Sequence, residues 1–284
     1  MSHTIEAATA QPIRPASRSG WIRRHPLLAF FAWFFTVGQA FAFTPVLFDP
    51  PVPDQVFIIG STLVGLLLPA LVITRLTGGP EAVRRMLRSF VDWRVGLRWY
   101  AFALLAAPLV TVGLGVLIAG PPDDWTAAIV SVFLVQLVFT LVPNNWAEEG
   151  VWTGFVQTRM QTRHGALLGA VLTAPLFAIQ HVSMVADAGL VPGVILMAGL
   201  TILMVPYRIV SGFAWNRTGS LFLLGLVHAA GNAAAPGSGF GEGVLRHLYP
   251  DNELVGSLHL LAYALIGLAV LAATKGRIGP IRNV

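Results

Sequence analysis

The chain has 284 residues, of which 55% are hydrophobic and only 11% are charged, and its mean hydropathy is +0.72. A soluble domain carries about a quarter charged residues, so this composition excludes an ordinary soluble protein and fits a protein surrounded by lipid. Cysteine is absent, which excludes disulfides, zinc–thiolate sites and cysteine nucleophiles. Any metal site must therefore use His, Asp, Glu or Asn.

The N-terminal residues 1–24 are polar, contain two prolines and four arginines, and predict a disordered cytoplasmic tail. Residues 25–284 form the predicted membrane-embedded helical domain. It contains eight apolar runs, most of them near the roughly 20 residues that one helical span needs: 27–48, 56–74, 99–119, 126–143, 165–186, 189–207, 218–235 and 254–273. A cleaved signal peptide is the alternative for the first run, but a long polar leader and full span length favour a retained span. We therefore expect an all-α, polytopic transmembrane bundle of about eight spans.

The basic residues predict how this bundle is oriented. With the N-terminus inside, 17 of the 18 basic residues fall in segments on the inner side, and only Arg246 falls outside. The inner set is Arg14, Arg18, Arg23, Arg24, Arg75, Arg84, Arg85, Arg88, Arg94, Arg98, Arg159, Arg163, Arg208, Arg217, Lys275, Arg277 and Arg282. The positive-inside rule thus predicts that both termini are cytoplasmic. A pI of 10.4 is then explained by contact with the inner leaflet, and no nucleic-acid partner is expected.

Segment 80–98 lies between the second and third runs and mixes arginines with apolar side chains such as Met86 and Trp93. This pattern indicates either an amphipathic helix on the inner surface or a solvated linker. The outer loops 49–54 and 120–124 are acidic and proline-rich, in agreement with the predicted orientation.

Five polar side chains interrupt three of the apolar runs or extend them: Glu148, Glu149, His181, His228 and Asn232. Taken singly, each has a structural explanation, such as a hydrogen bond to a neighbouring helix. Ionisable groups inside a bilayer are costly, however, and usually mark a functional site.

These groups can meet at a similar depth. Counted from the nearest inner arginine, Glu148 and His228 lie about 16 Å and His181 about 27 Å from the inner surface, at 1.5 Å per residue. This requires the fourth helix to continue past Pro143 towards Arg159, with a kink at that proline. Two adjacent glutamates are about 100° apart around a helix, so they should have distinct roles.

The order of these residues resembles that of the CPBP family of intramembrane proteases. That family, also called ABI, includes type II CAAX prenyl endopeptidases and bacteriocin-processing proteins. Its three motifs correspond here to Glu148-Glu149, to Phe177 four residues before His181, and to His228 four residues before Asn232. The resemblance covers about 126–235. It implies an intramembrane metalloendopeptidase whose catalytic residues are Glu148, Glu149, His181, His228 and Asn232.

The residue types fit such chemistry. A carboxylate in a low-dielectric site suits a general base, which makes Glu148 the candidate that activates water and Glu149 its support. Glu148, His181 and His228 are a candidate ligand set for a divalent metal, zinc being the expected one. Asn232 offers an amide donor for the oxyanion. A metal-free form, in which the histidines act directly on water and oxyanion, is left open.

The first motif departs from the family at Thr153, where the family has arginine. Threonine cannot form a bidentate pair with a carboxylate. Either another arginine, such as Arg159, takes its place, or the carboxylates depend on hydrogen bonds alone. This departure favours the first alternative function, a non-catalytic membrane scaffold. The second alternative is a proton or small-solute transporter, which the same buried groups would serve, although no inverted repeat is visible.

The substrate is expected to be a membrane-associated peptide or protein. Arginine-rich, lysine-poor composition indicates a bacterial plasma-membrane protein from a GC-rich genome, for which a prenylated substrate is not expected.

Overall fold

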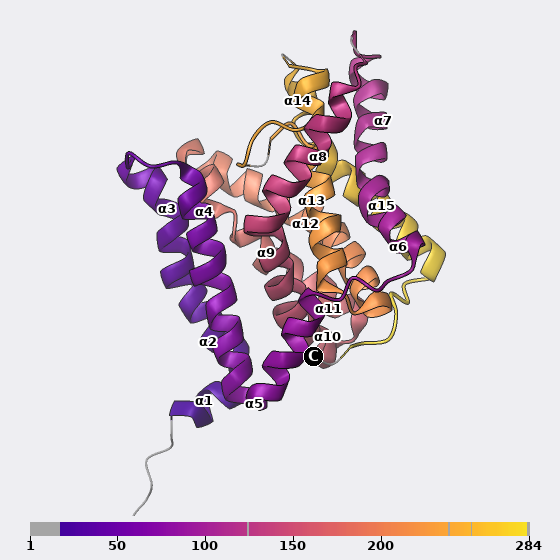
Figure 1. Cartoon of the computed structure of the whole chain (residues 1–284). Coiled ribbons are helices and arrows are strands. Elements are labelled where there is room, and N and C mark those ends of the chain that lie inside the picture. The colour runs from indigo at the N-terminus through magenta and orange to yellow at the C-terminus, as the bar shows by residue number, and fades with distance from the viewer. Residues whose placement is uncertain (1–17, 124, 238, 251, 283–284) are drawn as a thin grey trace, which may run out of the picture.

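The computed structural model describes residues 18–282 except 124, 238 and 251. These residues form a bundle of helices, and no strand occurs among them apart from a single bridge between Gly237 and Glu242 (Figure 1). The all-α, polytopic fold predicted from the hydropathy pattern is therefore confirmed.

Every predicted apolar run is helical. Four of the resulting segments consist of α-helices joined by π-helical turns: α2 (Pro26–Trp33), η1 (Phe34–Gly38) and α3 (Gln39–Phe48); α4 (Asp54–Gly60), η2 (Ser61–Leu67) and α5 (Leu68–Phe90); α6 (Leu97–Ala101), η3 (Phe102–Ala106) and α7 (Ala107–Ala119); and α8 (Ala128–Thr140), η4 (Leu141–Asn145), α9 (Trp146–Val151), η5 (Trp152–Gln157) and α10 (Thr158–His164). The others are α11 (Ala166–Ile179) with η6 (Val182–Ala188), α12 (Leu190–Thr218), α13 (Leu221–Ala234), α14 (Val244–Leu248), η7 (Glu253–Val255) and α15 (Leu258–Thr274).

The number of membrane spans follows from the length and composition of these helices. Within the described residues, five helical segments are long and apolar enough to cross a membrane, and a sixth qualifies if α11 and η6, bent by 50°, count as one span. Helices α13 and α15 are apolar but have only 14 and 17 residues. The eight predicted segments are thus present, whereas the count of eight crossings and the inside position of both termini stay predictions.

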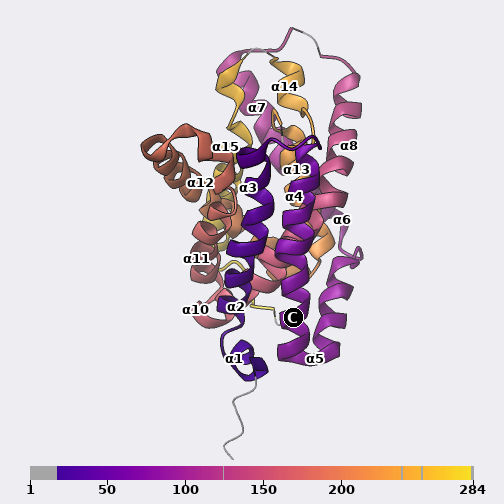
Figure 2. The same cartoon turned by 90° about the vertical axis from the view of Figure 1, so that its left-hand side faces the viewer.

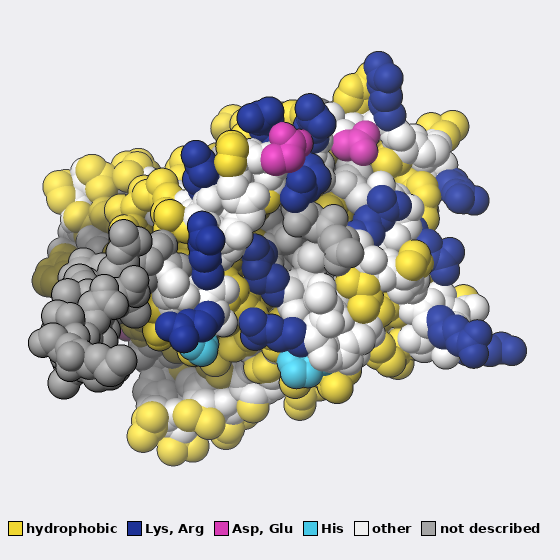
Figure 3. All heavy atoms as spheres, turned by 90° about the horizontal axis from the view of Figure 1, so that it is seen from below, with side chains coloured by type: hydrophobic (Ala, Val, Ile, Leu, Met, Phe, Trp, Pro, Cys, Tyr) yellow, Lys and Arg dark blue, Asp and Glu magenta, His cyan; other side chains and the backbone are white. Residues whose placement is uncertain are grey.

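The N-terminal tail and segment 80–98 differ from expectation. Residues 1–17 lie outside the described part, and Arg18–Arg24 form helix α1, so the prediction of disorder is wrong for that stretch. Helix α5 bends at Gly79 (φ 76°), continues to Phe90 and is followed by irregular chain to Gly96. The segment 80–98 is therefore helical only in its first half, and its position on the inner surface stays a prediction. Figure 3, the view from below Figure 1, shows Lys and Arg side chains gathered over the end of the molecule at which α5 lies.

The fourth segment runs unbroken from Ala128 to His164, as the position of the glutamates required. Pro143 lacks the N–H of a regular helix, and the chain forms the π turn η4 around it. A second π turn, η5, follows the glutamates, and the Thr158 hydroxyl donates to the Thr153 carbonyl across it, at 2.9 Å. These two turns set the faces on which the polar side chains lie.

Helix α13 lies within the bundle, against α7, α8 and α9 (Figures 1 and 2). All but three of its 14 residues are buried, because a sequence rich in Ala and Gly lets neighbouring helices approach closely. The Ser220 hydroxyl caps it by accepting from the Leu223 N–H at 3.0 Å. This buried helix carries His228 and Asn232.

Candidate active site

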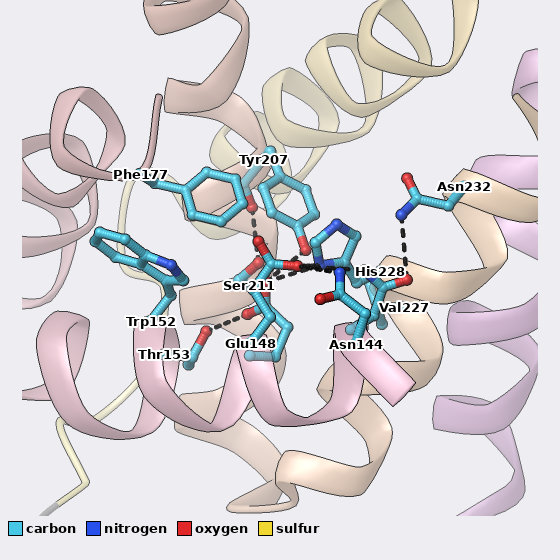
Figure 4. A network of polar contacts seen from close by, with 12 residues as sticks. Asn144, Glu148, Trp152, Thr153, Phe177, Tyr207, Ser211, Val227, His228 and Asn232 are labelled. Carbon is cyan, nitrogen blue, oxygen red and sulfur yellow. Dashed lines mark hydrogen bonds and ion pairs between the residues drawn. The ribbon is translucent and has the colours of Figure 1, made fainter. Parts of the chain in front are cut away.

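Glu148 and Glu149 lie on α9, and their side chains are 2% and 0% exposed. They have separate sets of partners, as their angular separation predicted. Figure 4 shows how side chains from several helices converge around Glu148. The candidate site is therefore closed to the surface on the side of these carboxylates.

Neutral amides surround the Glu148 carboxylate. Its Oε2 accepts hydrogen bonds from the side chains of Asn144 (3.2 Å) and Asn145 (3.3 Å), and its Oε1 accepts one from Gln180. Gln180 is itself fixed, because its Oε1 accepts from the Trp152 indole N–H. Glu148 thus lies in a ring of donors without an arginine or lysine partner among the described residues.

The Glu149 carboxylate has a charged partner. Both of its oxygens accept from the Arg208 guanidinium at 3.1 Å, and the arginine is completely buried. Two hydroxyls complete its shell, those of Tyr207 at 2.7 Å and Thr153 at 2.5 Å. Since charge-assisted, bidentate hydrogen bonds are strong and directional, Glu149 is held much more firmly than Glu148.

His228 brings the two carboxylates into one site. Its Nδ1 lies 3.2 Å from Glu149 Oε1 and 3.8 Å from Glu148 Oε2. The longer separation exceeds a direct hydrogen bond. The structure therefore joins Glu148, Glu149 and His228 as the sequence predicted.

His181 lies where α11 ends and the chain bends towards η6. The ring of Phe177, one turn earlier, contacts it with centroids 5.2 Å apart and also lies 6.2 Å from the His228 ring. The Phe177 ring thus contacts both histidines. The Nδ1 atom of His181 lies 3.2 Å from the Phe177 carbonyl, and within the described chain no hydrogen bond joins His181 to Glu148.

Asn232 belongs to the same network through an intermediary. Its amide donates to Asn145 Oδ1 at 3.1 Å, and Asn145 donates to Glu148. A primary amide has two N–H donors, and this contact uses one of them. The predicted role as an oxyanion donor is compatible with this position and stays a prediction.

The predicted metal ligands do not form a metal site as they lie. Among the residues that the structure describes, no group of three or more His, Asp or Glu side chains is arranged to hold a metal ion. The physical reason is that both Glu148 oxygens already accept from amides, and His181 Nδ1 lies against a backbone carbonyl. Zinc on Glu148, His181 and His228 remains a prediction from the resemblance.

Arg208 is the main residue that sequence reasoning misplaced. Its position after an apolar run suggested an inner loop, but α12 continues to Thr218 and buries it against Glu149. The mostly apolar residues after it, from Ile209 to Trp215, are the sequence feature that indicates a continuing buried helix. Arg159, the suggested substitute for the family arginine, instead donates to the Phe155 carbonyl at 2.8 Å and lies over the Phe155 ring.

Fold and site together define a class: a polytopic helical membrane protein whose buried polar centre combines two adjacent glutamates with two histidines. Residues 129–234 match the model of the family described as type II CAAX prenyl endopeptidase Rce1-like, so this part of the chain is similar to that family. The resemblance to the CPBP proteases is thereby confirmed for the segment that holds all five predicted site residues. Among curated proteins no match to the chain is found.

Proposed function

We propose that this protein is an intramembrane endopeptidase that hydrolyses peptide bonds of membrane-associated substrates. The observation that carries the proposal is that two adjacent buried glutamates in one site have different partners. Glu149 is neutralised by Arg208, whereas Glu148 faces neutral donors and lies 3.8 Å from His228. The match to a protease family over the same residues supports it.

In the proposed reaction, water binds between Glu148 and His228. Glu148 takes one proton from it, the oxygen attacks the peptide carbonyl, and Glu148 passes that proton to the leaving amine. The free N–H of Asn232 stabilises the oxyanion, since a positioned donor in a dry site acts strongly on developing charge. His181 and His228 orient the water and the carbonyl. No step requires a group beyond the chain's own residues and water.

A zinc ion held by Glu148, His181 and His228 is the alternative form of this proposal. Such an ion would polarise the water and lower its pKa. It would require Gln180 to release Glu148 and His181 to turn away from the Phe177 carbonyl. The substrate is proposed to be a membrane-associated peptide or protein, and the location a bacterial plasma membrane.

The test compares Glu148→Gln with Glu149→Gln. Glu148→Gln removes the base and should lower the rate by about 100-fold or more, the usual contribution of a general base. It should melt like the wild type, because a neutral amide costs less to bury than a carboxylate. Glu149→Gln leaves Arg208 as an unpaired buried charge, so it should lower the melting temperature clearly.

The measurement is cleavage of quenched-fluorescence peptides in detergent micelles, with and without a lipid anchor, beside thermal melts. Cleavage by Glu148→Gln at the wild-type rate would remove Glu148 from the role of base. Absence of cleavage by the wild type on all peptides, together with normal complementation by both variants, would favour the scaffold function.

A further inference from the structure

One arginine and one threonine at the edge of the candidate site form an arrangement that the motifs alone do not predict. Arg208 belongs to α12, yet its Nη2 donates to the Thr153 hydroxyl as well as to Glu149 Oε2. Thr153 is four residues after Glu149, on the same helical segment, and both side chains are completely buried. The guanidinium therefore lies at the tip of the Thr153 side chain.

Helical geometry explains why an arginine at position 153 could contact the same carboxylate that Arg208 contacts. Side chains at i and i+4 are neighbours on a helix, so a long basic side chain at position 153 would itself reach Glu149. Threonine is too short and uncharged to do so. The space beyond it is filled by a guanidinium that arrives from α12 instead.

Arg208 is oriented by a further contact that leaves it little freedom. Its Nε donates to Gln157 Oε1 at 2.8 Å, and Gln157 Nε2 donates back to the Arg208 carbonyl at 2.9 Å. Gly212, one turn after Arg208, makes room for this amide, because a Cβ there would lie 2.5 Å from Gln157 Nε2. The guanidinium also lies 5.0 Å from the centre of the Phe177 ring.

The bidentate pair also determines which oxygen of Glu149 faces His228. Arg208 Nη2 and Thr153 donate to Glu149 Oε2, whereas Oε1 accepts from Arg208 Nη1 and Tyr207 and lies 3.2 Å from His228 Nδ1. A glutamate held in this way presents one fixed acceptor to the histidine. Free rotation of the carboxylate would lose that orientation, and misplacement of a catalytic group by about 1 Å can cost 100-fold in rate.

We propose that Arg208 is the positioning residue of the active site: it holds Glu149, and through it His228, from a different helix than the one on which the matched family places its arginine. This inference rests on the proposed peptidase function. A guanidinium thus lies beside Glu149 although position 153 carries a threonine, because this arginine comes from α12.

The inference can be tested by transferring the arginine from position 208 to position 153. Arg208→Ala should lower the cleavage rate roughly 100-fold, the loss expected when a catalytic group is misplaced. Arg208→Lys should recover little, because an ammonium cannot form the bidentate pair. The double variant Thr153→Arg/Arg208→Ala restores one arginine beside Glu149. Its cleavage rate should be at least about tenfold higher than that of Arg208→Ala.

Arg159→Ala is the matched control, since it removes a partly buried arginine from the same region that does not contact Glu149, and its rate should equal that of the wild type. Melting temperature is measured on every variant, because it reports whether Glu149 is paired with an arginine independently of the cleavage rate. The charge relocation should recover the stability lost in Arg208→Ala as well as the rate.

Four outcomes overturn the inference. They are a wild-type rate in Arg208→Ala, full activity in Arg208→Lys, a folded double variant with no gain in rate over Arg208→Ala, and a loss in Arg159→Ala equal to that in Arg208→Ala. Recovery of melting temperature in the double variant, with no cleavage by any form including the wild type, would instead contradict the proposed peptidase function and reduce Arg208 to a structural partner of Glu149.

Discussion

At the scale of single residues, the site separates two carboxylates that the sequence places side by side. Glu149 is paired with a guanidinium, and Glu148 is surrounded by the amides of Asn144, Asn145 and Gln180. The same dipeptide thus supplies one carboxylate with a guanidinium partner and one whose hydrogen-bond donors are side-chain amides. This asymmetry is the basis for assigning proton transfer to Glu148.

Metal dependence is also decided at this scale. Because Glu148 accepts from Asn144, Asn145 and Gln180, and His181 Nδ1 lies against a backbone carbonyl, the metal-free form of the proposed reaction predicts that purified protein holds no stoichiometric zinc and keeps its cleavage rate after treatment with a chelator. Elemental analysis by mass spectrometry, run beside the rate, checks both. Loss of activity on chelation that added zinc reverses, with no zinc bound by His228→Ala, would establish the metal ligands predicted from the resemblance.

The sequence predicted the convergence of Glu148, Glu149 and His228 because carboxylates and imidazoles are costly in apolar runs and usually serve a shared site there. It could not predict Arg208. An arginine after an apolar run resembles the end of a span, and only the packing of α12 against the fourth segment shows that the helix continues around it. The amides Asn145 and Gln180 were equally hidden, since their role depends on side-chain orientation across helices.

At the scale of elements, π turns and glycine contacts shape the bundle. In the N-terminal pair of spans, η1 and η2 approach so closely that a Cβ on Gly65 would lie 2.4 Å from Gly38 Cα. The sequence indicated two spans here but not their crossing point. This contact holds the segment whose Thr62 donates to Asn144, one of the amides that bind Glu148.

Gly65→Ala should therefore destabilise the protein, by ~1–3 kcal/mol as for overpacking at a site where backbone cannot move away. Gly113→Ala is the matched control, because nothing lies within 4 Å of a Cβ at that helical glycine. Alanine favours helix over glycine, so the control should be neutral or slightly stabilising. Thermal melts in one detergent compare the two, and equal melting temperatures would contradict the proposed crossing.

At the scale of the whole molecule, the basic residues still predict its orientation in the membrane. The burial of Arg208 removes it from the count of inner-surface charges, and Arg159 is partly buried as well. Hydropathy predicted the helical segments well because lipid imposes a strong constraint on composition. It did not settle how many of them cross, since two apolar helices are short and one is bent.

Single-cysteine labelling tests the orientation cleanly, because the native chain has no cysteine. An impermeant maleimide should label Val52→Cys in intact cells and should label Arg88→Cys only after the membrane is opened. Both positions are exposed, so poor access does not explain a difference. The reverse pattern would invert the predicted topology.

The central claim is that water activated by Glu148 hydrolyses a peptide bond, and isotope labelling tests it most directly. Cleavage of a susceptible membrane peptide in water enriched with oxygen-18 should place one heavy oxygen in the new carboxyl group of the product. The same reaction with Glu148→Gln should yield about 100-fold less labelled product. Product formed by the wild type without the heavy oxygen, or labelled product formed equally by both proteins, would contradict the account.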